Sequence, residues 1–290
     1  MRLVSLPDGT AIWASNALEP VILYREIVTE GTYERHGITI RDGDAVFDVG
    51  ANIGLFSIHV ARTVPGARVH AFEPLPPLFD ALTRNLERHA PAVRAHNVGL
   101  GGEAGDAVFE FDPDMTMAAT MYPTVLKDGA DRRASVSAWA VAGFADLHRV
   151  QPTAVTSLIV SRADRPLGRL LAMALGVPIA VGREVRRRVR LRRHTCRMRT
   201  LPAAMRDAGV DEIGLAKIDV EGAEEAVLAG IDEATWPKIR QLVIEVHDVN
   251  GRLDRLHRLL DSRGYRTTSA REDWALHALL GISTLYAIRA

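Results

Sequence analysis

The stretch VFDVGANIG, residues 46–54, decides the fold of this chain. Its first residues form an apolar run of the kind that fills a buried strand, and Gly50 and Gly54 then mark a tight turn into a helical pattern. Glycine suits such a turn, because a ligand can approach closely a backbone that carries no Cβ atom. In an open parallel sheet, ligands bind beyond the carboxyl ends of the strands. We therefore expect this turn, with Asn52 between the glycines, to border a ligand site.

The residues on both sides of this stretch alternate between strand and helix patterns. Buried-strand patterns cover 44–49, 68–72, 93–98, 213–218 and 241–246, and helical patterns cover 53–63, 77–89, 223–228 and 253–262. This alternation is typical of right-handed crossovers in a parallel sheet. Two last strand patterns, 265–268 and 283–288, predict an antiparallel hairpin. We therefore predict an α/β fold with a mostly parallel sheet and an antiparallel C-terminal edge hairpin.

The length of 290 residues fits one large domain with an insertion as well as it fits two domains. We divide the chain into an N-terminal cap (1–43), a core made of two segments (44–104 and 201–290), and an insertion (105–200). The cap combines a hairpin pattern at 3–15 with apolar residues at helical spacing over 20–27. The insertion begins with strand-like alternation and contains a helical pattern at 162–181. We predict that it binds the acceptor or forms a lid.

The composition excludes several classes of protein. The 36 basic and 36 acidic residues give a net charge of zero, which argues against a protein that coats nucleic acid or an anionic membrane. The longest apolar run, 170–181, is too short for a transmembrane helix, which needs about 20 residues. Cys196 is the only cysteine, so no internal disulfide can form, and we interpret it as inert. We expect a cytoplasmic protein.

An acidic residue follows the glycine turn at the spacing expected for a residue that binds ribose. Glu73 lies 19 residues after Gly54, at the end of the second strand pattern. A carboxylate there can accept hydrogen bonds from both ribose hydroxyls of an adenosine. The rival ligand is a dinucleotide, whose fingerprint is G-x-G-x-x-G. Here Asn52 replaces the second glycine, so the close approach to a pyrophosphate is not provided. This favours S-adenosylmethionine, which has no phosphate.

Five blocks of the sequence resemble the FkbM family of S-adenosylmethionine-dependent methyltransferases. They are VFDVGANIGLFS (46–57), AFEPLP (71–76), NVGLGGEAG (97–105), IGLAKIDVEGAEEAVLAGI (213–231) and WPKIRQLVIEVHD (236–248). Within the family, the chain is most similar to the branch associated with natural-product assembly lines. The resemblance implies a Rossmann-like class I methyltransferase fold. It also implies O-methylation of a hydroxyl on a small-molecule or carrier-tethered natural-product intermediate.

The resemblance also implies which residues hold S-adenosylmethionine. These are Asp48, Gly50, Asn52, Gly54, Glu73, Asn97, Gly99 and Asp219, all within the matching blocks, and Tyr33 in the lead-in to the first core strand. Tyr33 is expected to cap the cofactor. The stretch 115–193 of the insertion does not match the family closely, so the resemblance does not fix the identity of the acceptor.

Four titratable residues follow two neighbouring strands of the predicted sheet. Asp219 and Glu221 come at the end of the fourth core strand, and Glu245 and His247 come at the end of the fifth. Alternation along a strand places residues two apart on the same side. An alcohol is a poor nucleophile until its proton leaves, so a methyltransferase that acts on a hydroxyl needs a base or a cation. We therefore assign catalytic or positioning roles to all four.

The sequence leaves the choice between a base and a cation open. We prefer His247 as the base, since its usual pKa of about 6.5 leaves the imidazole largely neutral at pH 7. In the alternative, Asp219, Glu245 and His247 bind a divalent metal such as Mg²⁺.

The function also has alternatives. One is an N-methyltransferase that acts on a peptide or sugar intermediate, and another is a non-catalytic docking domain that keeps the nucleoside pocket. The arginine-rich run at 183–199 could bind an acidic carrier domain, although an arginine-decorated strand with one exposed face accounts for it equally simply. A small-molecule acceptor is the partner we expect, with no nucleic acid.

Overall fold

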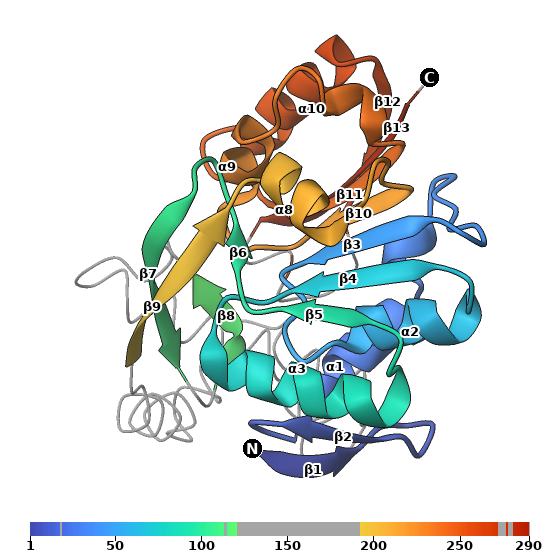
Figure 1. The fold of residues 1–290 in the computed structure, drawn as a ribbon, viewed down its shortest axis with the longest axis vertical. Coiled ribbons are helices and arrows are strands. Elements are labelled where there is room, and N and C mark those ends of the chain that lie inside the picture. The colour runs from blue at the N-terminus through green and yellow to red at the C-terminus, as the bar shows by residue number, and fades with distance from the viewer. Residues whose placement is uncertain (18, 113–114, 121–191, 272–276, 278–280, 290) are drawn as a thin grey trace, which may run out of the picture.

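A seven-stranded sheet forms the centre of the computed structural model, which describes residues 1–17, 19–112, 115–120, 192–271, 277 and 281–289. Its strands run in the order β12-β13-β11-β10-β3-β4-β5 (Figure 1). Their bounds are β3 Ala45–Val49, β4 Arg68–Phe72, β5 Arg94–His96, β10 Leu215–Ile218, β11 Gln241–His247, β12 Tyr265–Ala270 and β13 Ile282–Arg289. Each of the strands predicted from the sequence for the core is present, with ends that shift by a few residues.

Strand direction follows the prediction. Pairing is parallel between β5 and β4, between β4 and β3, between β3 and β10, and between β10 and β11. β13 pairs antiparallel with both β11 and β12, which confirms the predicted antiparallel C-terminal edge. Because the parallel strands share one direction, their carboxyl ends meet at a single edge of the sheet. The residues that follow β3, β4, β10 and β11 are thereby brought together.

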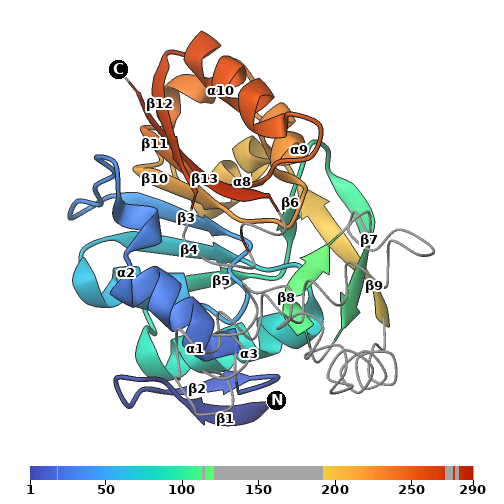
Figure 2. The ribbon, with the colours of Figure 1, turned by 180° about the vertical axis from the view of Figure 1, so that it is seen from behind.

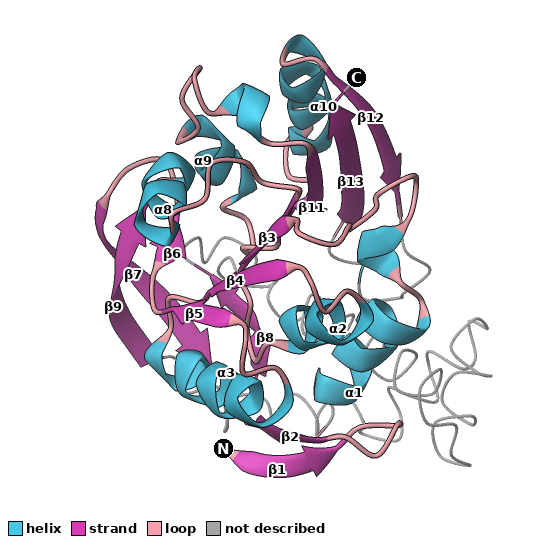
Figure 3. Cartoon of the chain, turned by 45° about the vertical axis from the view of Figure 1, so that its right-hand side comes forward, coloured by secondary structure: helices cyan, strands magenta, loops and turns pink. Residues whose placement is uncertain are grey.

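Helices cover both faces of the sheet and create two separate cores (Figure 3). The helices are α1 Glu19–Tyr24, α2 Leu55–Thr63, α3 Pro76–His89, α8 Leu201–Ala208, α9 Glu224–Ala229 and α10 Arg252–Ser262. Strand alternation separates the cores, because Val46 packs with α2 and α3 whereas Phe47 and Val49 pack with α8 and α9. Asp48 therefore belongs to the face covered by α2. The predicted α/β fold is confirmed, with helices on both faces of the sheet.

The N-terminal residues add a small layer beside α3 (Figure 2). β1 (Arg2–Ser5) and β2 (Ala11–Ala14) form the predicted hairpin, and Asn85 of α3 holds Trp13 through hydrogen bonds to its backbone N–H and C=O. The helical pattern over 20–27 is realised in two pieces, because α1 ends at Tyr24 and a π-helix, η1 (Arg25–Thr29), continues the chain. A 3₁₀ turn, η2 (Thr32–Glu34), then leads toward the core.

A second sheet of four strands, in the order β6-β9-β7-β8, lies at one end of the molecule (Figure 1). Its strands are β6 Gly99–Leu100, β7 Gly105–Asp112, β8 Met115–Thr120 and β9 Arg192–Arg199. The two ends of the predicted insertion, β7 and β9, pair antiparallel with each other, and β6 of the core joins them. The helical pattern at 162–181 and the apolar run at 170–181 lie outside the described residues.

A 3₁₀ turn, η4 (Trp236–Lys238), precedes β11. In the part of the chain that the structure describes, no helix has the length and apolar character needed to span a membrane.

Candidate active site

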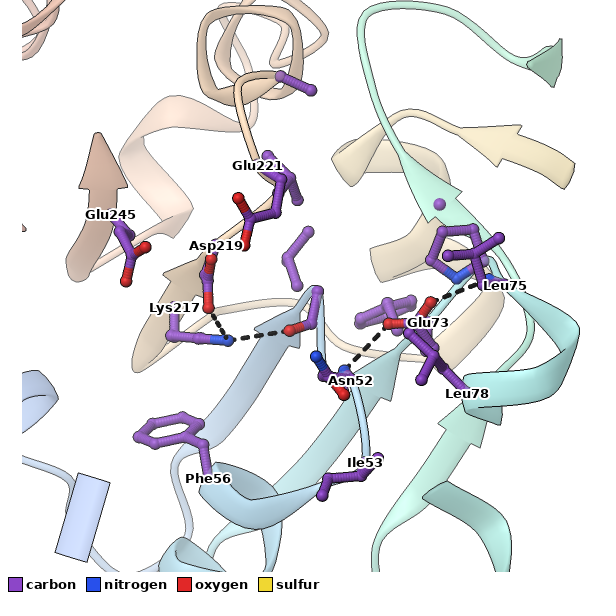
Figure 4. Close-up of a pocket in the computed structure, with 18 of the residues that line it drawn as sticks. Asn52, Ile53, Phe56, Glu73, Leu75, Leu78, Lys217, Asp219, Glu221 and Glu245 are labelled. Carbon is purple, nitrogen blue, oxygen red and sulfur yellow. Dashed lines mark hydrogen bonds and ion pairs between the residues drawn. The ribbon is translucent and has the colours of Figure 1, made fainter. Parts of the chain in front are cut away.

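A cavity opens at the carboxyl ends of β3, β4, β10 and β11 (Figure 4). Eight of the predicted site residues line it: Tyr33, Gly50, Asn52, Glu73, Gly99, Asp219, Glu221 and Glu245. Four others do not line it: Asp48, Gly54, Asn97 and His247. Figure 4 shows Glu73 and Asn52 on one side of the cavity and the carboxylates of Asp219, Glu221 and Glu245 on the other. We call these two sides the donor side and the acid side.

Other parts of the protein approach the glycine turn closely. Gly50 has φ +80°, and a Cβ atom built there would lie 1.8 Å from the backbone oxygen of Asp219. A Cβ on Gly54 would lie 2.6 Å from Leu82 Cδ1 of α3. Packing of the protein itself therefore requires glycine at both positions. They let the turn pack against β10 and α3, and Gly50 still borders the cavity.

Glu73 ends β4 and is anchored to the turn by its side chain. Its Oε2 accepts a hydrogen bond from the backbone N–H of Asn52 (3.0 Å), and its Oε1 accepts one from Leu75 (2.9 Å). Each carboxylate oxygen has a further lone pair with which to accept a hydroxyl. Burial raises the pKa of Glu73 to about 8, although the two backbone hydrogen bonds oppose the shift. Asn97 donates to the backbone oxygens of Glu73 and Pro74, so it shapes this corner from outside the cavity.

The donor side fits the adenosine portion of S-adenosylmethionine. Asn52 stands in the left-handed region with φ +51°, and its Oδ1 is buried with no hydrogen-bond partner among the described residues. A buried oxygen without a donor is costly, so it calls for a donor from a ligand. Leu75 and Leu78 provide apolar wall beside Glu73 (Figure 4). An acidic residue for the ribose, an unsatisfied amide oxygen and apolar walls for the base are thus all present.

Lys217 joins the two sides of the cavity, and the sequence analysis missed it. It lies opposite Asp48 in the β10–β3 register, on the face covered by α2. Its Nζ donates to the backbone oxygen of Gly50 (2.9 Å) and pairs with Asp48 Oδ1 and Asp219 Oδ2, each at 3.2 Å. Burial alone lowers the pKa of Lys217, but the carboxylates of Asp219 and Asp48 outweigh it and raise the pKa above its usual range. The sequence did offer one signal for it, namely a charged lysine within LAKI (215–218), a strand that is otherwise apolar.

Asp48 supports this arrangement from below the cavity. It is fully buried, and its Oδ2 accepts a hydrogen bond from Ser57 Oγ of α2 at 2.7 Å. With Lys217 on its other oxygen, Asp48 ties β3 to both β10 and α2. It therefore positions the glycine turn instead of contacting the cavity.

On the acid side, Tyr33 bridges two carboxylates. Its hydroxyl lies 3.4 Å from both Asp219 Oδ2 and Glu245 Oε2. Burial raises the pKa of Glu245 well above its usual range, and the carboxylates of Asp219, Glu26 and Glu221 raise it further. Strand alternation does not place Glu221, because β10 ends at Ile218 and Glu221 has φ +52° in the following turn. It still reaches the same cavity as Asp219, as expected.

His247 lies behind Glu221, away from the cavity lining. Its Nε2 is 3.2 Å from Glu221 Oε2 and 3.9 Å from Glu245 Oε1. Burial lowers the pKa of His247, but the hydrogen bond and charge of Glu221 outweigh it and raise the pKa to about 9. The contact with Glu221 thus favours the protonated imidazole, whereas the sequence led us to expect a neutral one. Ligand atoms of Glu221, Glu245 and His247 all lie within 4.8 Å of one another. The metal-binding set predicted from the sequence contained Asp219 in place of Glu221.

Two further residues on the acid side were missed. Glu26 of η1 and His277 both line the cavity, and both are buried. No motif marks either of them in the sequence, because each comes from a segment without other chemistry-bearing residues at a recognisable spacing. Cys196 of β9 is buried, and burial with the nearby Glu73 raises the pKa of its thiol to about 11, in keeping with an inert residue.

The arginine-rich run is described only over 192–199, where it forms β9. Cys196 and Met198 point into the structure, whereas Arg193 and Arg197 are exposed. Arg193 pairs with Glu110 of β7 at 2.8 Å, and Arg199 lies 3.6 Å from Asp207. This is the arrangement expected of an arginine-decorated strand with one exposed face.

Comparisons with known proteins agree with the geometry. The model of the methyltransferase FkbM domain matches residues 48–267. The chain is 37% identical over 273 residues to 31-O-demethyl-FK506 methyltransferase FkbM of Streptomyces tacrolimicus, covering 94% of this chain and 92% of that protein. It is 29% identical to methyltransferase sdnD of Sordaria araneosa, over 92% of this chain and 90% of that one.

Two other comparisons differ in coverage. The chain is 33% identical to a part of AMB antimetabolite synthetase AmbE of Pseudomonas aeruginosa, over 93% of this chain but 12% of the synthetase. A crystal structure of methyltransferase FkbM from Methylobacillus flagellatus has a TM-score of 0.48 and 16% identity, covering 92% of this chain and 52% of that one. The family model and the full-length relative agree with the resemblance of the five sequence blocks. The chain therefore belongs to the FkbM family of S-adenosylmethionine-dependent methyltransferases.

Proposed function

We propose that this chain transfers a methyl group from S-adenosylmethionine to a hydroxyl of a small-molecule or carrier-tethered natural-product intermediate. The observation that carries the proposal is the pair of unlike sides in one cavity, with a set of residues suited to adenosine facing four carboxylates, those of Glu26, Asp219, Glu221 and Glu245. The names of two relatives support the substrate class: a 31-O-demethyl-FK506 methyltransferase and an AMB antimetabolite synthetase. A cytoplasmic location stays a prediction.

On the donor side, the residues bind and orient. S-adenosylmethionine supplies a methyl group already activated by its sulfonium, so much of the catalysis is alignment. In this proposal, Glu73 accepts the ribose hydroxyls, and Asn52 Oδ1 accepts a donor from the same ligand. Lys217 holds the Gly50 carbonyl and the Asp219 carboxylate at fixed separation, so the turn and the acid side keep their relative position.

On the acid side, the acceptor hydroxyl must lose its proton. Glu221 lines the cavity and His247 does not, so the group that contacts the acceptor is the Glu221 carboxylate. His247, protonated near neutrality, would hold that carboxylate in place through its 3.2 Å contact. We therefore transfer the role of the base from the imidazole to Glu221 and keep His247 as its positioning partner. Asp219 and Glu245, joined by Tyr33, would orient the acceptor.

An amine acceptor is the second candidate, because buried carboxylates bind a protonated amine as readily as they orient a hydroxyl. The segment 105–200 would contribute to acceptor choice in either case, since β7 and β9 bring Phe109 and Met198 to the cavity. A docking domain without catalysis is a third possibility. It would have no use for four cavity-lining carboxylates opposite the donor side.

The test is turnover with an isotopically labelled methyl donor and fractionated extract of a producing organism, followed by mass spectrometry. We expect a product heavier by one labelled methyl, with fragmentation that places it on oxygen. A label on nitrogen would contradict the hydroxyl acceptor and support an amine acceptor instead. The Glu221→Gln variant should bind S-adenosylhomocysteine normally and lose turnover. Normal binding with no labelled product in any fraction, wild type included, would favour the docking domain.

A further inference from the structure

The second sheet contributes a buried methionine, Met198 of β9, to the wall of the cavity. Met198 is 7% exposed and lines the cavity together with Gly99 of β6. The two residues are opposite each other in the β6–β9 register. A Cβ atom on Gly99 would lie 2.6 Å from Met198 Sδ and 3.3 Å from Pro74 Cβ. The thioether and Pro74 therefore both border the space above Gly99, which a larger side chain at that position would fill.

This methionine lies on the donor side of the cavity. Pro74, which shares the space above Gly99 with it, directly follows Glu73 in the chain. Cys196 lies on the same face of β9 as Met198, two residues away, and is close enough to Glu73 for that carboxyl to raise the pKa of its thiol. Leu75 belongs to the same hydrophobic core as Met198. The end of the cavity around Glu73 thus has an apolar wall, and Met198 is part of it.

The direction in which adenosine extends follows from the chemistry of its ribose. The two ribose hydroxyls share one edge of the ring, and the base and the 5′-carbon leave the ring at opposite ends of that edge. If Glu73 accepts the hydroxyls, the sulfonium on the 5′-carbon has to face the acid side, where the acceptor binds. The adenine then extends the other way. Figure 4 shows Leu75 beyond Glu73 as seen from Asp219, so that direction leads to the apolar wall.

We propose that Met198 contacts the adenine of S-adenosylmethionine and positions it. The inference rests on the proposed function, because the direction of the ligand follows from the assigned donor and acid sides. A thioether suits this role, since sulfur makes favourable contacts with aromatic rings and the unbranched side chain adapts to their shape. Met198 would thus be a positioning residue that the cofactor itself touches.

This assignment divides the work of the second sheet. Phe109 of β7, which also lines the cavity, is opposite His194 on β9. Met198 is four residues further along β9, which corresponds to about 13 Å of strand. One sheet can therefore serve two ligands, with Met198 at the adenine and Phe109 left for the acceptor. The last residues of the predicted insertion would then belong to cofactor binding.

The first test is calorimetric titration of the full chain with S-adenosylhomocysteine and, separately, with adenosine. Met198→Ala should raise the Kd of both ligands by the same factor, about tenfold, because both carry the adenine. Arg197→Ala is the matched control, since Arg197 is exposed on the other face of β9, and it should change neither Kd. Circular dichroism reports that each variant is folded. An unchanged Kd in folded Met198→Ala would overturn the inference.

A second measurement does not depend on how well a variant folds. In the wild-type chain labelled with [methyl-¹³C]methionine, the Met198 resonance is identified by its absence from the spectrum of Met198→Leu. We expect a nuclear Overhauser effect between this methyl group and H2 or H8 of the adenine in the S-adenosylhomocysteine complex. Its absence from a complex that forms would overturn the inference and leave the proposed function standing. A wild type that binds neither ligand would contradict the proposed function as well.

Discussion

The two sides of the cavity are built in different ways. On the donor side, nearby backbone holds Glu73, which accepts hydrogen bonds from Asn52 and Leu75, and Asn52 Oδ1 is left for a ligand. On the acid side, carboxylates face one another, and each depends on partners from distant segments, such as Tyr33 between Asp219 and Glu245. The donor side is therefore preorganised for one ligand. The acid side gathers carboxylates from distant segments, so its geometry depends on long-range packing.

Lys217 is the point at which these two sides meet. It contacts the backbone of the donor-side turn and the first carboxylate of the acid side with the same ammonium group (Figure 4). Substitutions on the donor side should thus act through packing and hydrogen bonds, whereas those at Lys217 should act through uncompensated charge. The predictions below use this difference.

The largest expected effect is the loss of the fold in Gly50→Val. The added Cβ would lie 1.8 Å from the Asp219 backbone oxygen, and the position has φ +80°, which a β-branched residue rarely adopts. We expect a loss of about 5 kcal/mol or more in the free energy of unfolding, in the range reserved for severe disruption. Urea denaturation measures it. Gly209→Val is the matched control, since Gly209 has φ +65° and nothing within 4 Å of its Cβ direction. Equal losses in the two variants would show that contact with Asp219 is unimportant.

Lys217→Met should be the next most damaging. It nearly keeps the length of the side chain but leaves buried Asp48 and half-buried Asp219 without their cation. Removing one partner of a buried ion pair costs about 3–5 kcal/mol. We expect that loss at neutral pH by urea denaturation, with part of it recovered in the Lys217→Met/Asp48→Asn double variant. A double variant no more stable than Lys217→Met alone would contradict the charge explanation.

The residues that could be predicted from the sequence are those whose role depends on local spacing. The turn 46–54 and Glu73 were found because strand periodicity and a short separation place them together. Lys217 was missed because a lone lysine in an apolar strand has no local partner that reveals its three contacts. The charge of His247 could not be predicted, because Glu221 reaches it only through a turn with φ +52°. Donor-side residues were thus more predictable than acid-side ones.

Glu73→Ala should weaken S-adenosylhomocysteine binding with little effect on the fold. The variant removes the proposed acceptor of the ribose hydroxyls, and hydrogen bonds to charged groups contribute about 1.5–3 kcal/mol. We expect a Kd raised about 10- to 150-fold by calorimetry. Asn97→Ala, which alters the same corner from outside the cavity, is the control and should change Kd much less. Unchanged affinity in Glu73→Ala would place the ribose elsewhere.

The smallest effect, and the most specific to the donor side, is a pH dependence of cofactor affinity. Burial raises the pKa of Glu73 to about 8, so at pH 7 the carboxyl of the free protein is mostly protonated. Two ribose hydroxyls that donate to this group favour its ionised form, so its pKa is lower in the complex than in the free protein.

The sign of the pH dependence follows from the proton count. Because the complex binds fewer protons than the free protein, binding releases a proton, and affinity for S-adenosylhomocysteine rises with pH below about 8, by about tenfold per unit at most. Above that pH the free carboxyl is already ionised, and its contribution levels off. Calorimetry in two buffers of different ionisation enthalpy measures the released proton directly. Glu73→Gln should lose this component and keep any contribution from His247, whose pKa is about 9. If the affinity of the wild type and that of Glu73→Gln depended on pH in the same way, Glu73 would not be the source of the released proton.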